Sequence, residues 1–137
     1  MRSNRYHSGR AYPSGAARLI VALAVFVAGC SGTRQASPVD PDRARDTLRL
    51  ALEGWKNGDP PSVLHDGSPS ITVQDTDWLA GMKLVDYQVT GDGKAVESNL
   101  YVPVKLTLRP KRGKDVKKAV SYIVGTSPIL TVFRDFR

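Results

Sequence analysis

The sequence predicts an α+β domain in which one long amphipathic N-terminal helix packs on a curved antiparallel sheet of about four strands. Two observations predict this class. Apolar residues recur with the helical period of 3.6 over residues 40–58, and from residue 83 onward they alternate with a period of two. Short polar turns separate the alternating segments, which is typical of consecutive antiparallel strands. A helix placed before such strands buries its apolar face on one side of the sheet.

The helix has clear start and stop signals. Asp40 is a favourable N-cap and Pro41 fits the first helical position. Asn57 and Gly58 supply the stop. Spacings of three and four predict one apolar, core-facing surface. Its residues are Ala44, Leu48, Ala51, Leu52 and Trp55.

Between the helix and the alternating segments lies a stretch rich in Pro, Ser, Asp and Gly. We predict a short helical turn over residues 61–64, then a loop, then a short strand over residues 70–74. His65 and Asp66 stand side by side in this stretch. They form either a solvated turn or a general acid and base group near a pocket.

Four longer strands are predicted after residue 83, over residues 84–90, 99–110, 119–125 and 129–136. The second alternates without a gap. Its apolar face holds Leu100, Val102, Val104, Leu106 and Leu108. Pro103, on the other face, has no N–H to donate to a ladder and therefore predicts an edge position or a bulge.

The N-terminal segment is typical of an export signal. Residues 19–28 are all apolar, which is half of the about 20 residues that a membrane-spanning helix needs. Four arginines and no acidic residue precede the end of this run. A basic region, a short apolar region and small residues together indicate a signal peptide, here residues 1–29.

The tetrapeptide Val27, Ala28, Gly29 and Cys30 resembles the lipobox of bacterial lipoproteins. The resemblance implies cleavage between Gly29 and Cys30, a thioether-linked diacylglyceryl group on Cys30, and acylation of the new amino terminus. Two or more acyl chains anchor a protein stably to a membrane. Residues 30–39 are then a lipidated cysteine and a flexible tether, and residues 40–137 form a single domain.

Removal of the signal peptide changes the charge of the chain. The full chain carries +7, but without the four leader arginines 16 basic residues face 13 acidic ones, a net of +3. We therefore expect no nucleic-acid partner, although the full composition is basic. The only cysteine is Cys30, which excludes an intramolecular disulfide.

The order of a helix followed by a bent sheet over residues 40–136 resembles the cystatin-like and nuclear-transport-factor-2-like superfold. That superfold includes isomerases, dehydratases and other pocket enzymes with Asp, His or Tyr in the pocket, and many domains without catalysis. No catalytic set of the family matches positions in this chain. If the domain is instead a pocket enzyme, its candidate catalytic residues are His65 with Asp66 or Asp77. Further polar residues on predicted strands are Tyr87, Tyr101, Tyr122 and Asp86.

One charge cluster stands out near the end of the chain. Its basic residues are Lys111, Arg112, Lys114, Lys117 and Lys118, with Asp115 as the one acid among them. A lysine-rich turn is either solvated, where it discourages aggregation, or a surface for anionic lipids or polymers.

The leading expectation is a lipid-anchored cell-envelope protein with a small binding or structural domain and no enzymatic activity. The sequence has no metal-ligand spacing, phosphate-binding loop or catalytic-triad pattern, so we expect no cofactor and no metal. The partners expected are membrane lipid through Cys30 and an envelope protein or anionic polymer. Ser31 after the cysteine implies the outer membrane if the source is Gram-negative, by the lipoprotein family rule.

Overall fold

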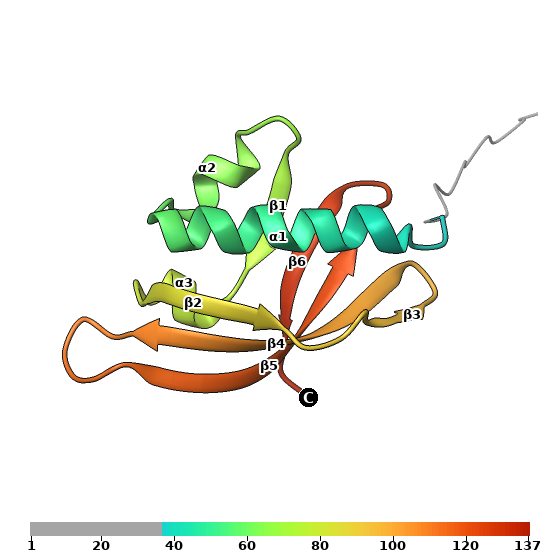
Figure 1. The fold of residues 1–137 in the computed structure, drawn as a ribbon. Coiled ribbons are helices and arrows are strands. Elements are labelled where there is room, and N and C mark those ends of the chain that lie inside the picture. Colours follow the sequence, from blue (N-terminus) through green and yellow to red (C-terminus); the bar gives the residue numbers. More distant parts are fainter. Residues whose placement is uncertain (1–36) are drawn as a thin grey trace, which may run out of the picture. The chain divides into compact units, whose positions relative to one another are not determined.

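A computed structural model describes residues 37–137, which form an α+β domain as predicted (Figure 1). The elements in chain order are α1 (Pro41–Asn57), α2 (Pro61–His65), β1 (Ile71–Gln74), α3 (Thr76–Leu79), β2 (Lys83–Val89), β3 (Lys94–Val96), β4 (Asn99–Arg109), β5 (Val116–Gly125) and β6 (Leu130–Asp135). The expected long N-terminal helix is corrected to a 17-residue helix that begins well inside the chain and is joined by two short helices.

The start and stop signals of α1 act as the sequence predicts. The Asp40 carboxylate accepts hydrogen bonds from the N–H groups of Asp42 and Arg43, at 3.1 Å each. Gly58 ends the helix with φ 91°, a left-handed conformation that glycine adopts without strain. All five residues of the predicted apolar face are buried.

The sheet has six strands, so the expectation of about four antiparallel strands is wrong. The strand order is β1-β6-β5-β4-β2, and β3 also pairs with β4. The strand predicted at residues 70–74 is present as β1, but it pairs in parallel with β6 at the far end of the chain, which makes the sheet mixed. β1 and β3 have four and three residues, too few for a clear period-two signal.

Pro103 does not mark an edge strand, because β4 lies between β5 and β2. The register with β5 continues through Pro103 and Ser121 without a bulge. On the other side, β2 pairs with residues 104–109 and β3 with residues 99–101, so Pro103 lies in the gap between them. The Pro103 carbonyl accepts from Thr90 N–H at 3.0 Å, and its missing N–H deprives no strand of a partner.

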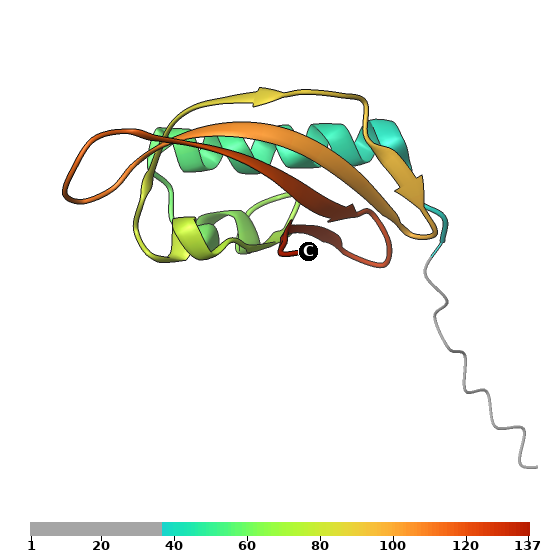
Figure 2. The same ribbon diagram turned by 90° about the horizontal axis from the view of Figure 1, so that it is seen from below.

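α1 lies along one face of the curled sheet and forms the core with it (Figures 1 and 2). The five residues of the predicted apolar face of β4 are all buried there. Trp55 of α1 and Trp78 of α3 stack with ring centroids 5.1 Å apart. Their indole N–H groups donate to the carbonyls of Met82 and Asp59 at 2.8 and 2.9 Å, so neither polar group is buried without a partner.

The two ends of α1 meet different parts of the sheet. At its N-terminal end, Val39 N–H donates to the Glu97 carbonyl at 3.1 Å and Asp40 N–H donates to Thr126 Oγ1 at 3.2 Å. Val39, assigned to the tether from the sequence, therefore lies against the domain and packs on its core. At the C-terminal end of α1, the β4–β5 hairpin extends past the helix (Figures 1 and 2).

Candidate functional site

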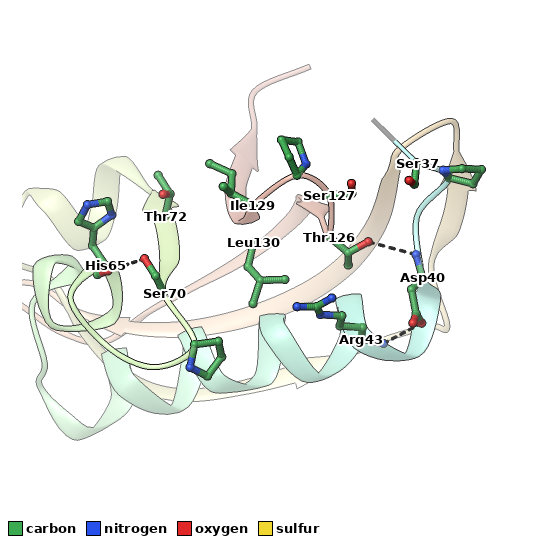
Figure 3. Close-up of a pocket in the computed structure, with 13 residues that line it drawn as sticks. Ser37, Asp40, Arg43, His65, Ser70, Thr72, Thr126, Ser127, Ile129 and Leu130 are labelled. Carbon is green, nitrogen blue, oxygen red and sulfur yellow. Dashed lines mark hydrogen bonds between the residues drawn. The ribbon is translucent and has the colours of Figure 1, made fainter. Parts of the chain in front are cut away.

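An open polar groove of about 640 Å³ lies beside the N-terminal end of α1 (Figure 3). This volume is in the range of ligand-binding clefts. The groove is formed where the start of α1, the segment leading into β1 and the loop before β6 converge. Its lining residues are Ser37, Pro38, Asp40, Arg43, His65, Pro69, Ser70, Thr72, Thr126, Ser127, Pro128, Ile129 and Leu130.

One end of the groove is fixed by the cap of α1. The Asp40 side chain is held by the helix N–H groups, and the Asp40 main chain is held by the Thr126 hydroxyl. Thr126 is buried. This wall is therefore preorganised, which lowers the entropic cost of binding a ligand.

The polar lining of the groove consists of hydroxyl groups, the Arg43 guanidinium, the Asp40 carboxylate and the His65 imidazole. Five Ser and Thr side chains line it, and each hydroxyl both donates and accepts hydrogen bonds. The Arg43 guanidinium takes part in no ion pair with any residue between 37 and 137. A free guanidinium binds carboxylate or phosphate groups through paired N–H donors.

The predicted acid–base residues do not assemble in this groove. His65 lines it, and the Ser70 hydroxyl donates to the His65 carbonyl. Asp66 caps the C-terminal end of α2 through its N–H. Asp77 binds Lys118 at 2.8 Å instead. In the described part of the chain, no hydrogen bond joins the His65 imidazole to Asp66 or Asp77, and Asp40 lies at the opposite end of the groove (Figure 3).

The polar residues flagged on strands lie outside the polar groove. Tyr87 donates to Glu53 at 2.7 Å, and burial together with this hydrogen bond raises the pKa of Tyr87 to about 12. Asp86 pairs with Lys56 at 3.3 Å, and both Asp86 and Tyr87 line a second concavity of about 530 Å³. The Tyr101 hydroxyl accepts a hydrogen bond from the Arg137 guanidinium.

Tyr122 belongs to a buried ionic network that the sequence did not reveal. Asp75 Oδ2 accepts from the Tyr122 hydroxyl at 2.6 Å and from Arg134 Nη2 at 2.6 Å. Asp75 Oδ1 caps α3 by accepting from the N–H groups of Asp77 and Trp78. Burial, and then the Asp75 charge, raise the pKa of Tyr122 well above its ordinary value. None of the three side chains at the centre of this network lines the polar groove, so we assign the network to stability.

The predicted basic cluster is divided by the fold. Lys118 is committed to Asp77, and Asp115 is bound by Arg109 at 2.8 and 3.0 Å. Lys111, Arg112, Lys114 and Lys117 are exposed and, among residues 37–137, take part in no ion pair.

Several sequence predictions lie outside the described residues. These are the signal peptide over residues 1–29, the lipobox with Gly29 and Cys30, and the tether as far as residue 36. Among residues 37–137, no helix is both long and apolar enough to span a membrane. The same part of the chain contains no group of three or more His, Cys, Asp or Glu side chains placed to hold a metal ion.

Sequence reasoning missed most of the groove because each residue has a plain local interpretation. Arg43 lies outside the predicted apolar face of the helix, Ser70 begins a predicted short strand, and Thr126 lies between two predicted strands. Only His65 was flagged, because its imidazole titrates near neutrality. Comparison with known proteins adds no assignment: no family model, no curated protein and no solved structure matches the chain.

Proposed function

We propose that the chain is a lipid-anchored protein of the bacterial cell envelope whose domain binds a polar ligand in the groove beside α1. The observation that carries the binding proposal is that five hydroxyl side chains and Arg43, which has no ion pair among residues 37–137, line one cleft with a preorganised wall at Asp40 and Thr126. The signal peptide, the lipobox and Cys30 support the anchor. On this proposal, the groove lies at the end of the domain where the tether joins it.

The lining of the groove suggests the chemical class of the ligand. Arg43 offers paired donors for a carboxylate or phosphate, and the hydroxyls suit a ligand rich in hydroxyl or amide groups. Pro69, Pro128 and Ile129 add apolar surface between these polar groups. An acidic sugar or a peptide with a free carboxylate combines both requirements.

Binding is tested by chemical shift mapping on the isotope-labelled, full-length protein in neutral detergent. The probes are acetate, inorganic phosphate and N-acetylglucosamine, which present the three candidate groups separately. We expect shifts at Arg43, Ser70 and Thr126, and Arg43→Gln to weaken acid binding by about tenfold, the loss of one charge-assisted hydrogen-bond pair. Arg49→Gln is the matched control, because Arg49 is exposed on α1 outside the groove. Shifts confined to other surfaces contradict the proposal.

The anchor is tested separately. Cys30→Ala should abolish acyl labelling and partitioning into the detergent phase, because the thioether needs the sulfur atom. Thr33→Ala, in the predicted tether, should leave both unchanged. Labelling that persists in Cys30→Ala would remove the lipoprotein assignment.

A pocket enzyme is the second candidate, because His65 lines the groove. Without a paired carboxylate, His65 would act alone as a general base or acid. Any ligand found by shift mapping can be followed over time by proton spectra. Conversion that His65→Asn abolishes while binding persists would establish the enzyme, and a ligand that stays unchanged for days favours the binding protein.

A further inference from the structure

Four exposed basic side chains at or beside the turn of the β4–β5 hairpin define a surface that we call the basic tip. It comprises Lys83, Lys111, Arg112 and Lys114. Lys83, the first residue of β2, pairs with Arg109 at the base of the hairpin. The Lys111 side chain lies over Gly81, where its Cε would be 3.0 Å from an added Cβ. Two segments of the chain therefore bring these charges together.

The positive charge of the basic tip is left uncompensated by the fold. Asp115, the one acid in the hairpin loop, is held in two hydrogen bonds by Arg109. Asp77, the nearest acid of α3, is held by Lys118 and Arg134. Because these carboxylates are already paired with cations, the basic tip keeps an excess of positive charge, although Asp59 lines a concavity together with Lys83.

The position of the basic tip distinguishes between possible anionic partners. The β4–β5 hairpin, which carries Lys111, Arg112 and Lys114, extends past the C-terminal end of α1, and the described chain enters α1 at the opposite end (Figures 1 and 2). The 17 residues of α1 separate these two ends by about 25 Å at 1.5 Å per residue. Within the described domain, the chain therefore enters at one end of α1, and the hairpin that carries the basic tip lies at the other.

We propose that the basic tip docks on the carboxylate-bearing glycan and peptide polymer of the cell wall. This proposal rests on the proposed lipid anchor, because the chain enters the domain at the end of α1 opposite the hairpin that carries the tip. The basic tip and this polymer carry opposite charges, so the solvated Lys and Arg side chains would contact closely spaced carboxylates. No deep pocket is needed, and the affinity comes from several weak contacts that salt screens.

The test is cosedimentation of the full-length, acylated protein in neutral detergent with purified cell-wall sacculi. The tip variant combines Lys111→Gln, Arg112→Gln and Lys114→Gln. The control combines Arg49→Gln, Lys94→Gln and Lys105→Gln, which remove the same charge from exposed positions outside the tip. We expect the tip variant to lose binding by about tenfold or more at low salt, and the control by less than about twofold.

Two results overturn the proposal. One is an equal loss of binding in both variants, which would indicate a net-charge effect. The other is tip-dependent retention on glycerophosphate-coupled beads without binding to sacculi, which would assign the tip to lipid headgroups. Because detergent removes the membrane from the assay, neither result depends on Cys30, so failure here is distinguishable from failure of the lipid anchor.

Discussion

Replacing Asp75 with alanine tests the buried network at its centre. Asp75 is 1% exposed. Its carboxylate accepts five hydrogen bonds, two from the main chain of α3, one from Tyr122 and two from Arg134. In Asp75→Ala, Arg134 remains charged and 8% exposed, with a 3.3 Å contact to the already paired Asp77 and a long 3.5 Å hydrogen bond to the Tyr122 hydroxyl.

The magnitude follows from two losses. Removing one partner of a buried ion pair costs about 3–5 kcal/mol, because the other charge stays buried and unpaired. Loss of the N-cap of α3 costs about 1 kcal/mol more. The two losses share one side chain and do not add fully, so we expect the free energy of unfolding to fall by about 4 kcal/mol. For a domain of about 100 residues this lowers Tm by roughly 15–30 °C.

The assay is urea unfolding of the full-length protein in neutral detergent, followed by the fluorescence of Trp78 and Trp55. Asp40→Ala is the matched control, because Asp40 caps α1 through two equivalent hydrogen bonds but contacts no buried arginine. We expect it to cost about 1 kcal/mol. The double variant Asp75→Ala with Arg134→Met should recover about 1 kcal/mol or more, because it removes the orphaned charge. A cost for Asp75→Ala no larger than that for Asp40→Ala would refute the reasoning.

Two further predictions concern the same sheet. Gly125→Ala should lower the free energy of unfolding by about 1–3 kcal/mol, because an added Cβ would lie 2.6 Å from the stiff Thr131 side chain; urea unfolding measures this. Gly91→Ala is its control and should be nearly neutral, since its Cβ would lie 3.6 Å from Pro103. Because the pKa of Tyr122 is raised on folding, its contribution is complete below pH 10 and is lost as pH rises above that value. Stability should then fall by about 1.4 kcal/mol per pH unit from this group. Tyr122→Phe should make the fall in the free energy of unfolding between pH 10 and 11.5 less steep, with the contribution of Tyr87 remaining. An unchanged slope would contradict the role given to Tyr122.

The helix and the long strands were predictable because their signals are local. Asp40 and Gly58 fix the two ends of α1 through contacts within four residues of themselves. β4 is specified by an unbroken alternation along eleven residues. The pairing of β1 with β6 was not predictable, since Ile71 pairs with Leu130, which lies 59 residues later in the sequence. No local rule encodes such a contact, and a four-residue strand carries little pattern of its own.

The candidate site was less predictable than the fold, for the same physical reason. Arg43, Ser70 and Thr126 line one groove because β1 pairs with β6 in the folded domain. The buried network had one usable signal: Asp75 stands three residues before Trp78, as an N-cap residue stands before the first turn of a helix. Nothing in the sequence shows that Arg134, on an alternating strand, completes it.

The placement of the polar groove and the basic tip at opposite ends of α1 has a thermodynamic consequence. Residues more than about 10 Å apart with no shared partners contribute independently to binding, and α1 holds these two surfaces farther apart than that. Arg43→Gln should therefore weaken acid binding in the groove without changing cosedimentation with sacculi, and the triple tip variant should do the reverse. Independent losses would mean that the groove and the basic tip are separate binding surfaces. If either variant moved both measurements, the two surfaces would instead be parts of a single extended site.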